Sequence, residues 1–237
     1  MKKMIVCLIA FVLMTICSIG VFAQNQTASP GQSTTPIEAL PLQPAAIVPP
    51  PAPLPLIDPA NEIKGAALVE ALRKGGFVLY MRHAETGVVT EKCERSNLSA
   101  IGEENSRAVG SALRELKIPI GAVRSSEPCR CADTARLLGL GAVDITEDLN
   151  PVAPRPGFDI GAARMKRLNE MPAPGTNTIL VSHLHGSIKK EEWIHLQMAE
   201  VIVYRPDGIT QANAVARIPL ATWSTLKNAV ATAPVAQ

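Results

Sequence analysis

An α/β domain with a mostly parallel central sheet is the fold class that this sequence predicts. Short apolar runs alternate along the chain with segments in which apolar residues recur at helical spacing. This alternation is typical of parallel strands that are connected by helices. The chain has 237 residues, which is enough for one sizeable domain.

The first two predicted elements are a helix and a buried strand. Residues 67–74 carry apolar side chains at helical spacing, and Gly75–Gly76 follows as a stop signal. Residues 77–81 form a short, continuous apolar run. Such a run is typical of a strand that is covered on both faces.

The next predicted elements are a helix, a strand and a shorter helix. Ser99 is a good capping residue for the start of the second helix. We expect this helix to bury a stripe of apolar residues. The stripe consists of Ile101, Ala108, Val109, Ala112, Leu113 and Leu116. A second strand is expected over 120–123 and a third helix over 132–138.

The last predicted elements are a strand, a hairpin and a helix. Residues 178–181 are largely apolar and form the third expected strand. The segments 201–204 and 214–218 flank a turn over 205–208 and are typical of a hairpin at a sheet edge. A final helix is expected over 222–231.

The composition argues against a nucleic-acid partner. The formal net charge is +2, and aromatic residues make up only 3% of the chain. Nucleic-acid binding requires a clustered basic surface, and single-stranded binding commonly adds stacking aromatics. We therefore expect a different class of ligand.

The amino terminus is typical of an export signal. Lys2 and Lys3 precede an apolar run from Met4 to Phe22, and small Ala23 would precede the cut. The sequence thus predicts a signal peptide over 1–23 and an exported chain, periplasmic or secreted, without stable membrane insertion after cleavage. Because the run approaches the length of a bilayer span, an uncleaved anchor is the alternative.

A linker is predicted between the signal and the folded domain. Residues 24–60 are rich in proline, glutamine and serine, and they include Pro49, Pro50 and Pro51. Proline fixes the backbone and removes an amide donor, so this composition favours an extended spacer over a packed core. The domain is predicted to span 61–232.

Three cysteines lie outside the predicted signal, namely Cys93, Cys129 and Cys131. An oxidising compartment permits a disulfide. Cys129 and Cys131 are too close in sequence to be expected partners, so a disulfide would have Cys93 at one end. Three unpaired thiols are the alternative.

Polar clusters directly follow three of the predicted strands. They occupy 82–87, 124–126 with Arg130 close behind, and 182–183. In α/β sheets, ligands collect at the carboxyl ends of the strands. Arginine, histidine and serine side chains that meet there would suit a phosphate-like dianion.

These clusters carry a resemblance to a known family. The segment 79–86, Leu-Tyr-Met-Arg-His-Ala-Glu-Thr, resembles the signature of the histidine phosphatase superfamily, the phosphoglycerate mutase-like enzymes. Three later stretches resemble family elements in the same order. They are Leu98–Ser99 with Gly102, Ser125–Arg130 with Thr134–Ala135, and Leu180–His183.

The resemblance implies a three-layer fold and a mechanism. His83 would be the nucleophile that forms a phosphohistidine, which water then hydrolyses. Arg82 and Arg130 would bind the phosphoryl oxygens with forked donors, and His183 would donate to the same oxygens. In this scheme no metal or other cofactor would take part. The substrate would be a small phosphate monoester or a phosphohistidine, and the compartment suggests an envelope component.

The resemblance leaves the general acid open. Many members use a carboxylic acid to protonate the leaving oxygen. Glu147, Asp148, Glu127 and Glu200 are the candidates in this sequence. The family's glutamate before a glycine turn is not evident, and members without the acid act on good leaving groups such as phosphohistidine.

Two alternatives belong to other functional classes. The first is a catalytically silent module of the same fold that only binds phosphate or a partner. The second is a metal-dependent hydrolase that uses His183 and His185, with His195 as a third ligand, because alternate residues of a strand face the same side.

Overall fold

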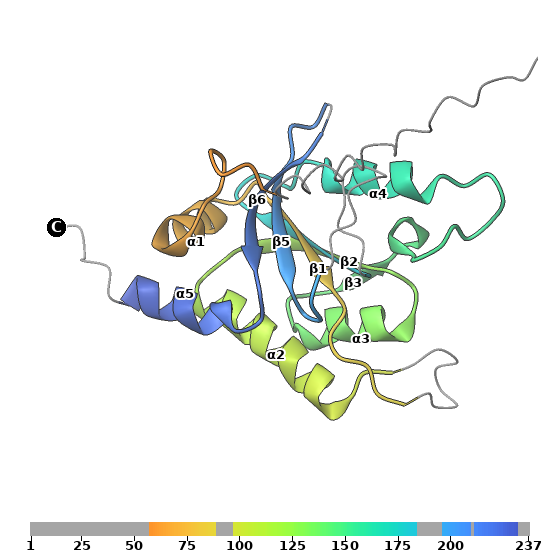
Figure 1. Ribbon diagram of the computed structural model, residues 1–237, viewed down its shortest axis with the longest axis horizontal. Coiled ribbons are helices and arrows are strands. Elements are labelled where there is room, and N and C mark those ends of the chain that lie inside the picture. The colour runs from red at the N-terminus through yellow and green to blue at the C-terminus, as the bar shows by residue number, and fades with distance from the viewer. Residues whose placement is uncertain (1–56, 89–96, 184–195, 210, 232–237) are drawn as a thin grey trace, which may run out of the picture. The chain divides into compact units, whose positions relative to one another are not determined.

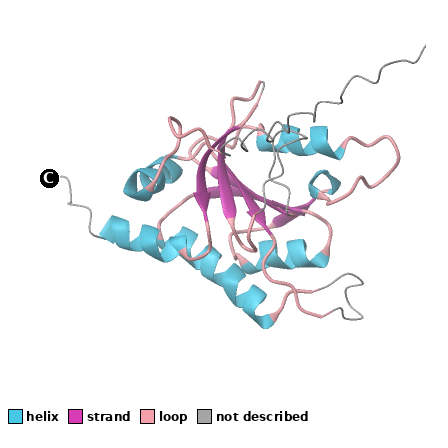
Figure 2. Cartoon of the chain, viewed as in Figure 1, coloured by secondary structure: helices cyan, strands magenta, loops and turns pink. Residues whose placement is uncertain are grey.

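The structure is a computed structural model that describes residues 57–88, 97–183, 196–209 and 211–231. All of them belong to the unit Pro51–Gln237, in which helices surround a central sheet (Figure 2). The predicted signal over 1–23 and nearly all of the predicted linker lie outside the described residues.

Every helix and strand that the sequence predicted is present. The elements in chain order are α1 (Gly65–Lys74), β1 (Val78–Arg82), α2 (Ala100–Glu115), β2 (Ile120–Ser125), α3 (Cys129–Leu137), β3 (Val143–Ile145), the 3-10 helix η1 (Glu147–Leu149), α4 (Ile160–Leu168), β4 (Asn177–Ser182), β5 (Val201–Arg205), β6 (Asn213–Ile218) and α5 (Thr222–Ala231). Of these, β3, η1 and α4 were not predicted.

The described strands form one six-stranded sheet in the order β3-β2-β4-β1-β5-β6. The first four strands are parallel, whereas β5 runs antiparallel to β1 and pairs with β6 as a hairpin. The register aligns Arg82 with Ser182 and Ser125 with Val181. The carboxyl ends of β1, β2 and β4 therefore lie side by side at one end of the sheet.

The sheet is covered on both faces, as the three-layer prediction requires. Leu79 and Met81 face the larger core cluster, to which α1, α2, α3 and α5 contribute. Val78 and Tyr80 face a smaller cluster that includes Leu168 of α4. Figure 1 shows α2, α3 and α5 on one side of the sheet and α4 on the other. The α/β class with a mostly parallel sheet is confirmed.

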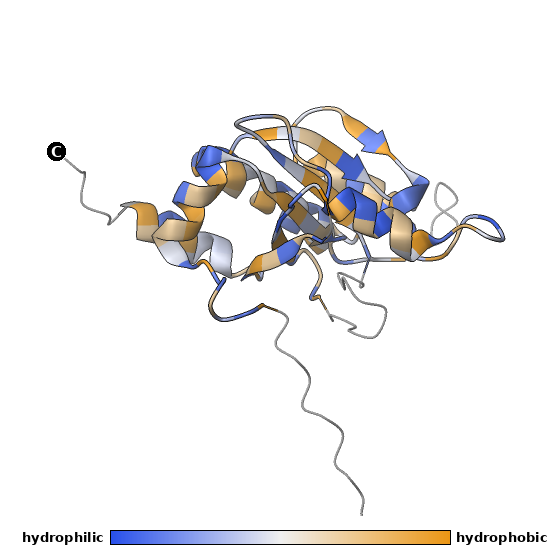
Figure 3. Ribbon diagram, turned by 90° about the horizontal axis from the view of Figure 1, so that it is seen from above, coloured by the Kyte–Doolittle hydropathy of each residue, from blue (hydrophilic) through white to orange (hydrophobic). Residues whose placement is uncertain are grey.

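Burial explains why β1 occupies the centre of the sheet. Its residues 78–81 are at most 1% exposed, as the continuous apolar run predicted. Each fully buried large apolar side chain contributes about 1.5–3 kcal/mol relative to an exposed one. Hydrophobic and hydrophilic residues alternate along the helices (Figure 3), so each helix can cover the sheet with one face.

The predicted buried stripe of α2 is wrong at its amino-terminal half. Ile101 is 57% exposed and Ala108 is also exposed. The buried face there is formed by Gly102, Ser106 and Gly110 instead. A Cβ atom on Gly110 would lie 1.9 Å from the carbonyl oxygen of Leu138, so the helix packs directly against backbone. Small residues, not apolar ones, define this contact.

Two elements escaped prediction because their local signals are weak. β3 has three residues, of which two are exposed, so it lacks an apolar run. α4 buries Arg164 and Leu168, and its cap is Asp159, whose side chain accepts from the amide of Ala162 at 2.9 Å. A buried arginine on the inner face hides the helical pattern of apolar residues.

The packed core reaches further towards the amino terminus than 61. Ile57 is only 9% exposed and belongs to the smaller core cluster. Within the described residues, no helix combines the length and the apolar character that a bilayer crossing requires.

Candidate active site

His83 follows the carboxyl end of β1 and is held by the neighbouring backbone. Its amide donates to the carbonyl of Ser182 at 2.9 Å, and its carbonyl accepts from the amide of Ala199 at 3.2 Å. The residue is 7% exposed. The central position of β1 thus fixes this histidine between β4 and the start of β5.

The ring of His83 has a defined tautomer. Its Nδ1 lies 2.9 Å from the carbonyl oxygen of Ala84, which can only accept a hydrogen bond. Nδ1 therefore carries the proton, and Nε2 keeps a free lone pair. Burial, together with the positive charges of Arg130 and Arg82, lowers the pKa of His83 from 6.5 to about 4. The imidazole is consequently neutral at pH 7.

Arg82 and Arg130 bring two positive charges to the same place. Burial lowers the pKa of Arg82, and the nearby charge of Arg130 lowers it further. Arg82 donates from Nη1 to the carbonyl of Leu196 at 2.6 Å, while its Nε is buried with no partner among the described residues. No described acidic side chain pairs with either arginine. Two uncompensated guanidinium groups favour an anion between them.

His183 joins this group from the end of β4. Its Nδ1 lies 3.1 Å from Nη2 of Arg130, and its ring centroid lies 5.5 Å from that of His83. Its Nε2 lies 2.9 Å from Oγ of Ser126. The structure therefore brings together the four side chains that the sequence singled out, although they come from three separate segments.

Thr134 fastens the loop after His83 to α3. Its hydroxyl accepts from the amide of Ala84 at 3.0 Å and donates to the carbonyl of Arg130 at 2.7 Å. One side chain thus sets the distance between the backbones that carry His83 and Arg130. Thr134 lies in one of the family-like stretches, but no other feature of the sequence indicated this role.

The candidate acids differ in their partners. Glu147 pairs with Arg155 at 2.7 Å, and Asp148 pairs with Arg167 at 2.7 Å. Glu200 is 1% exposed in its side chain and pairs with Arg217. In each case an arginine already holds the carboxylate, and no described contact joins it to the four pocket side chains.

Glu127 has a different environment from the other three carboxylates. Its Oε2 accepts from the side-chain amide of Asn150 at 2.6 Å. Asn150 also contacts Ser126, which contacts His183. Glu127 therefore reaches the pocket through two intervening side chains. Asn150 was missed in the sequence because no short motif marks it.

The cysteines behave differently from one another. Cys129 is disulfide-bonded, while Cys131 is a free, buried thiol. The partner that the sequence predicted, Cys93, lies outside the described residues. Burial raises the pKa of Cys131 to about 12, so its thiol is protonated at pH 7. Its sulfur packs 3.5 Å from Nε2 of His183.

Metal ligation has no support among the described residues, where His, Cys, Asp and Glu form no group of three that could hold an ion. His185 and His195, which the metal-dependent alternative requires, lie outside them.

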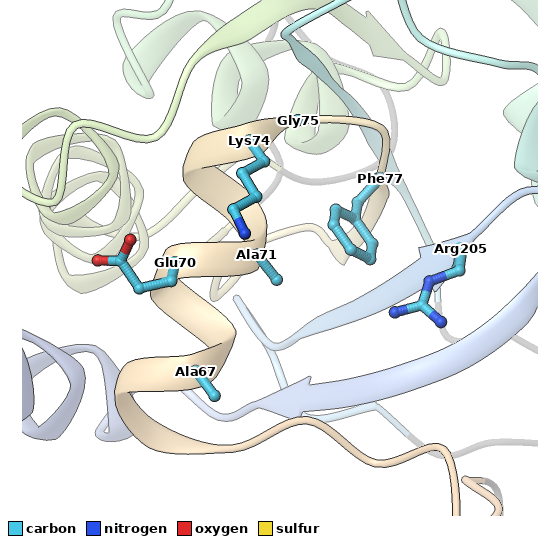
Figure 4. Close-up of a pocket in the computed structure, with 7 residues that line it drawn as sticks. All are labelled: Ala67, Glu70, Ala71, Lys74, Gly75, Phe77 and Arg205. Carbon is cyan, nitrogen blue, oxygen red and sulfur yellow. The ribbon is translucent and has the colours of Figure 1, made fainter.

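A separate surface cavity of about 500 Å³ lies at the other end of the sheet (Figure 4). Its lining residues are Ala67, Glu70, Ala71, Lys74, Gly75, Phe77 and Arg205. Phe77 precedes β1, whereas His83 follows it, so this cavity is distinct from the histidine pocket. Arg205 lies over the ring of Phe77 at 5.6 Å, and Glu70 pairs with Arg73 at 2.6 Å.

Comparison with known proteins supports the fold and the family resemblance. Residues 78–152 match the family described as histidine phosphatase superfamily (branch 1). No curated protein matches the chain. The solved structure of the protein histidine phosphatase SixA complexed with tungstate is 16% identical, with a TM-score of 0.50; the match covers 62% of this chain and 98% of that chain.

A second solved structure is a phosphoserine phosphatase from Entamoeba histolytica in complex with 3-phosphoglyceric acid. It is 14% identical with a TM-score of 0.42, and the match covers 60% of this chain and 96% of that chain. The likeness to SixA is one of fold. The family match over residues 78–152 and the likeness of fold agree with the resemblance that the sequence carries.

Proposed function

We propose that this chain is an exported phosphatase that hydrolyses a phosphate monoester or a phosphohistidine through a phosphohistidine intermediate on His83. The observation that carries the proposal is the free lone pair on Nε2 of His83, beside the guanidinium groups of Arg82 and Arg130. A neutral imidazole can attack phosphorus, and two arginines can stabilise the charge of the transferring group.

The reaction would proceed in two steps. Nε2 of His83 forms a bond to phosphorus while the bond from phosphorus to the leaving oxygen or nitrogen breaks, and the leaving group takes up a proton from solvent. Water then attacks the phosphohistidine and gives up a proton to solvent, which releases inorganic phosphate and restores the neutral imidazole. Arg82 and Arg130 would hold the equatorial oxygens during both transfers, so catalysis consists mainly of positioning and electrostatic stabilisation.

The carboxylate contacts favour a substrate with a good leaving group. Glu147, Asp148 and Glu200 are each held by an arginine, and no described contact joins them to the four pocket side chains. Glu127 reaches the pocket only through Asn150 and Ser126, so none of the candidate acids lies in described contact with the site of the leaving group. A general acid commonly contributes about 10²–10⁴-fold to the rate. We therefore expect phosphohistidine and aryl phosphates to be hydrolysed at least about 100-fold faster than alkyl phosphates.

Export to the periplasm or the exterior rests on the sequence of residues 1–23. Cell fractionation with sequencing of the mature amino terminus tests it. A first residue of Gln24 in an exported fraction supports cleavage, and retention of Met1 in the membrane fraction supports the uncleaved anchor.

The intermediate can be trapped directly. The purified chain is mixed with a labelled aryl phosphate, quenched in alkali within milliseconds and analysed for protein-bound phosphate. A phosphoprotein that is stable in alkali, labile in acid and absent from His83→Ala supports the mechanism. Asn177→Ala is a matched control, because Asn177 is buried at the opposite end of the sheet, where it holds the backbones of Phe77 and Leu72.

The same preparation separates the alternatives. Activity that survives a strong chelator excludes the metal-dependent hydrolase. If the wild-type chain hydrolyses neither phosphohistidine nor any monoester, and His83→Ala binds inorganic phosphate as tightly as the wild type, the silent binding module is the correct interpretation.

A further inference from the structure

Asn150 links the segment after η1 to the pocket. The residue is 7% exposed, and its Oδ1 lies 2.9 Å from Oγ of Ser126 and 3.1 Å from the backbone nitrogen of Glu127. Its Nδ2 lies 2.6 Å from Oε2 of Glu127. Three polar contacts thus surround a buried amide.

The direction of this amide is determined by partners that can play only one role. The backbone N–H of Glu127 can only donate, so it must face Oδ1. The carboxylate of Glu127 accepts, so it faces Nδ2. Rotating the amide of Asn150 by half a turn would place Nδ2 against the backbone N–H of Glu127 and Oδ1 against its carboxylate. The assignment of its oxygen and nitrogen therefore follows from the network.

The amide in turn fixes the hydroxyl and the ring. Because Oδ1 of Asn150 is an acceptor, the hydroxyl of Ser126 donates to it and presents a lone pair to Nε2 of His183. Nε2 therefore carries the proton. Nδ1 is left to accept from Arg130, whose guanidinium can only donate. The contacts at the two ends of the network, at Glu127 and at Arg130, require the same tautomer of His183.

We propose that Asn150, oriented by Glu127, is a positioning residue of the phosphate pocket. It acts through Ser126 to keep His183 in the tautomer whose Nδ1 accepts from Arg130. Nη2 of Arg130 is thereby held beside His83, while the other N–H groups of the guanidinium stay available for phosphoryl oxygens. The inference rests on the proposed function, because it assigns a role within the same pocket.

The network contacts both ring nitrogens of His183: Nδ1 lies 3.1 Å from Nη2 of Arg130, and Nε2 lies 2.9 Å from Oγ of Ser126. The role that the resemblance implied for His183, a donor to the phosphoryl oxygens, stays a prediction. The chain of contacts ends at Glu127, whose carboxylate lies at the surface.

The test uses the full chain and two activity-independent readouts. The first is the ¹⁵N spectrum of the His183 ring, which distinguishes the protonated from the unprotonated nitrogen. The second is the affinity for inorganic phosphate. In Asn150→Ala the hydroxyl of Ser126 is free to donate to Nε2, so the Nε2 signal moves towards that of an unprotonated nitrogen. Phosphate affinity and kcat/KM fall about tenfold, as expected for one displaced hydrogen bond.

The controls separate positioning from general destabilisation. Asn177→Ala also removes a buried amide with three backbone contacts, so it lowers Tm but leaves the His183 signals and phosphate affinity unchanged. At the exposed end, Glu127→Ala weakens phosphate binding, whereas Glu127→Gln recovers it because its amide oxygen still accepts from Asn150. These exposed changes keep the test valid even if Asn150→Ala fails to fold.

Two results overturn the inference. One is an Asn150→Ala chain with unchanged His183 signals and unchanged phosphate affinity. The other is a Glu127→Ala chain that binds phosphate as the wild type does. An inactive wild-type chain would instead overturn the proposed function, and the spectrum of His183 would still report whether the network sets its tautomer.

Discussion

Nη2 of Arg130 lies 3.1 Å from Nδ1 of His183, and 53 positions separate the two residues in the chain. The contact joins the first turn of α3 to the end of β4. Because the guanidinium can only donate, the ring nitrogen that faces it has no proton. A neutral histidine and a cation can therefore lie in contact without electrostatic repulsion between two charges.

The geometry of Arg130 predicts that lysine cannot replace it. Lysine keeps the positive charge but loses the planar fork that can contact His183 and a phosphoryl oxygen together. In Arg130→Lys, we expect kcat/KM to fall by at least about tenfold, the loss of one charge-assisted hydrogen bond. Steady-state kinetics on an aryl phosphate measure this, with Tm as the check on folding. A lysine variant with wild-type kinetics would contradict the role of the fork.

The lowered pKa of His83 predicts where activity is lost in acid. The nucleophile needs its free lone pair, and the pKa of His83 is about 4 because of burial and the charges of Arg130 and Arg82. We expect kcat/KM to stay level from pH 7 down to about pH 5 and to fall as the pH approaches 4. An acid limb near pH 6.5 would show that the pocket does not shift this group.

The same pKa predicts a pH dependence of stability. His83 titrates near 6.5 in the unfolded chain and near 4 in the folded chain, so the unfolded chain binds the extra proton between these values. Stability therefore rises with pH across this window, by up to about 3 kcal/mol. The His83→Gln variant has no titrating group at this position. Its free energy of unfolding should therefore change less between pH 7 and pH 4.5 than that of the wild-type chain. Denaturant unfolding at both pH values compares the two chains.

The packing of Gly102 predicts that even a methyl group there disturbs the pocket loop. A Cβ atom at this position would lie 2.0 Å from the carbonyl oxygen of Glu85, two residues after His83. In Gly102→Ala, we expect a destabilisation of about 1–3 kcal/mol and a loss of activity, because the loop must move. Glu104→Ala on the exposed side of α2 is the control, and it should leave both unchanged. Equal Tm values for the two variants would refute the close contact.

The buried carboxylate of Glu200 predicts a strong dependence on Arg217. Oε2 of Glu200 accepts from Nη2 of Arg217 at 2.9 Å and from the amide of Gln197 at 2.6 Å, while its carbonyl accepts from the amide of Arg82. Removal of the guanidinium would leave a buried acceptor without its main donor. We expect Arg217→Ala to lower the free energy of unfolding by about 1–3 kcal/mol.

A second substitution identifies the cause of that loss. Glu200→Leu in the Arg217→Ala background removes the carboxylate itself, so it should recover part of the lost stability. Thermal unfolding of the single and double variants measures the difference. If the double variant is less stable than the Arg217→Ala variant, the carboxylate of Glu200 is not the source of the destabilisation.

The order of the predicted elements, and the end of the sheet where the polar residues gather, follow from the sequence alone. Helical and strand periods are local properties, so α1, β1 and the β5–β6 hairpin could be predicted from short windows. The carboxyl ends of parallel strands lie together whatever their exact register, so Arg82, His83 and His183 could be assigned to one place before their distances were known.

Which atoms face one another depends on how distant segments of the chain pack. The network from Glu127 through Asn150 and Ser126 depends on the register of β2 against β4 and on the position of η1, and neither leaves a periodic signal. The glycine face of α2 was likewise hidden, because close backbone packing selects residues for the absence of a side chain. Hydrogen-bond direction and steric fit act between distant segments, and they are defined only when the chain has folded.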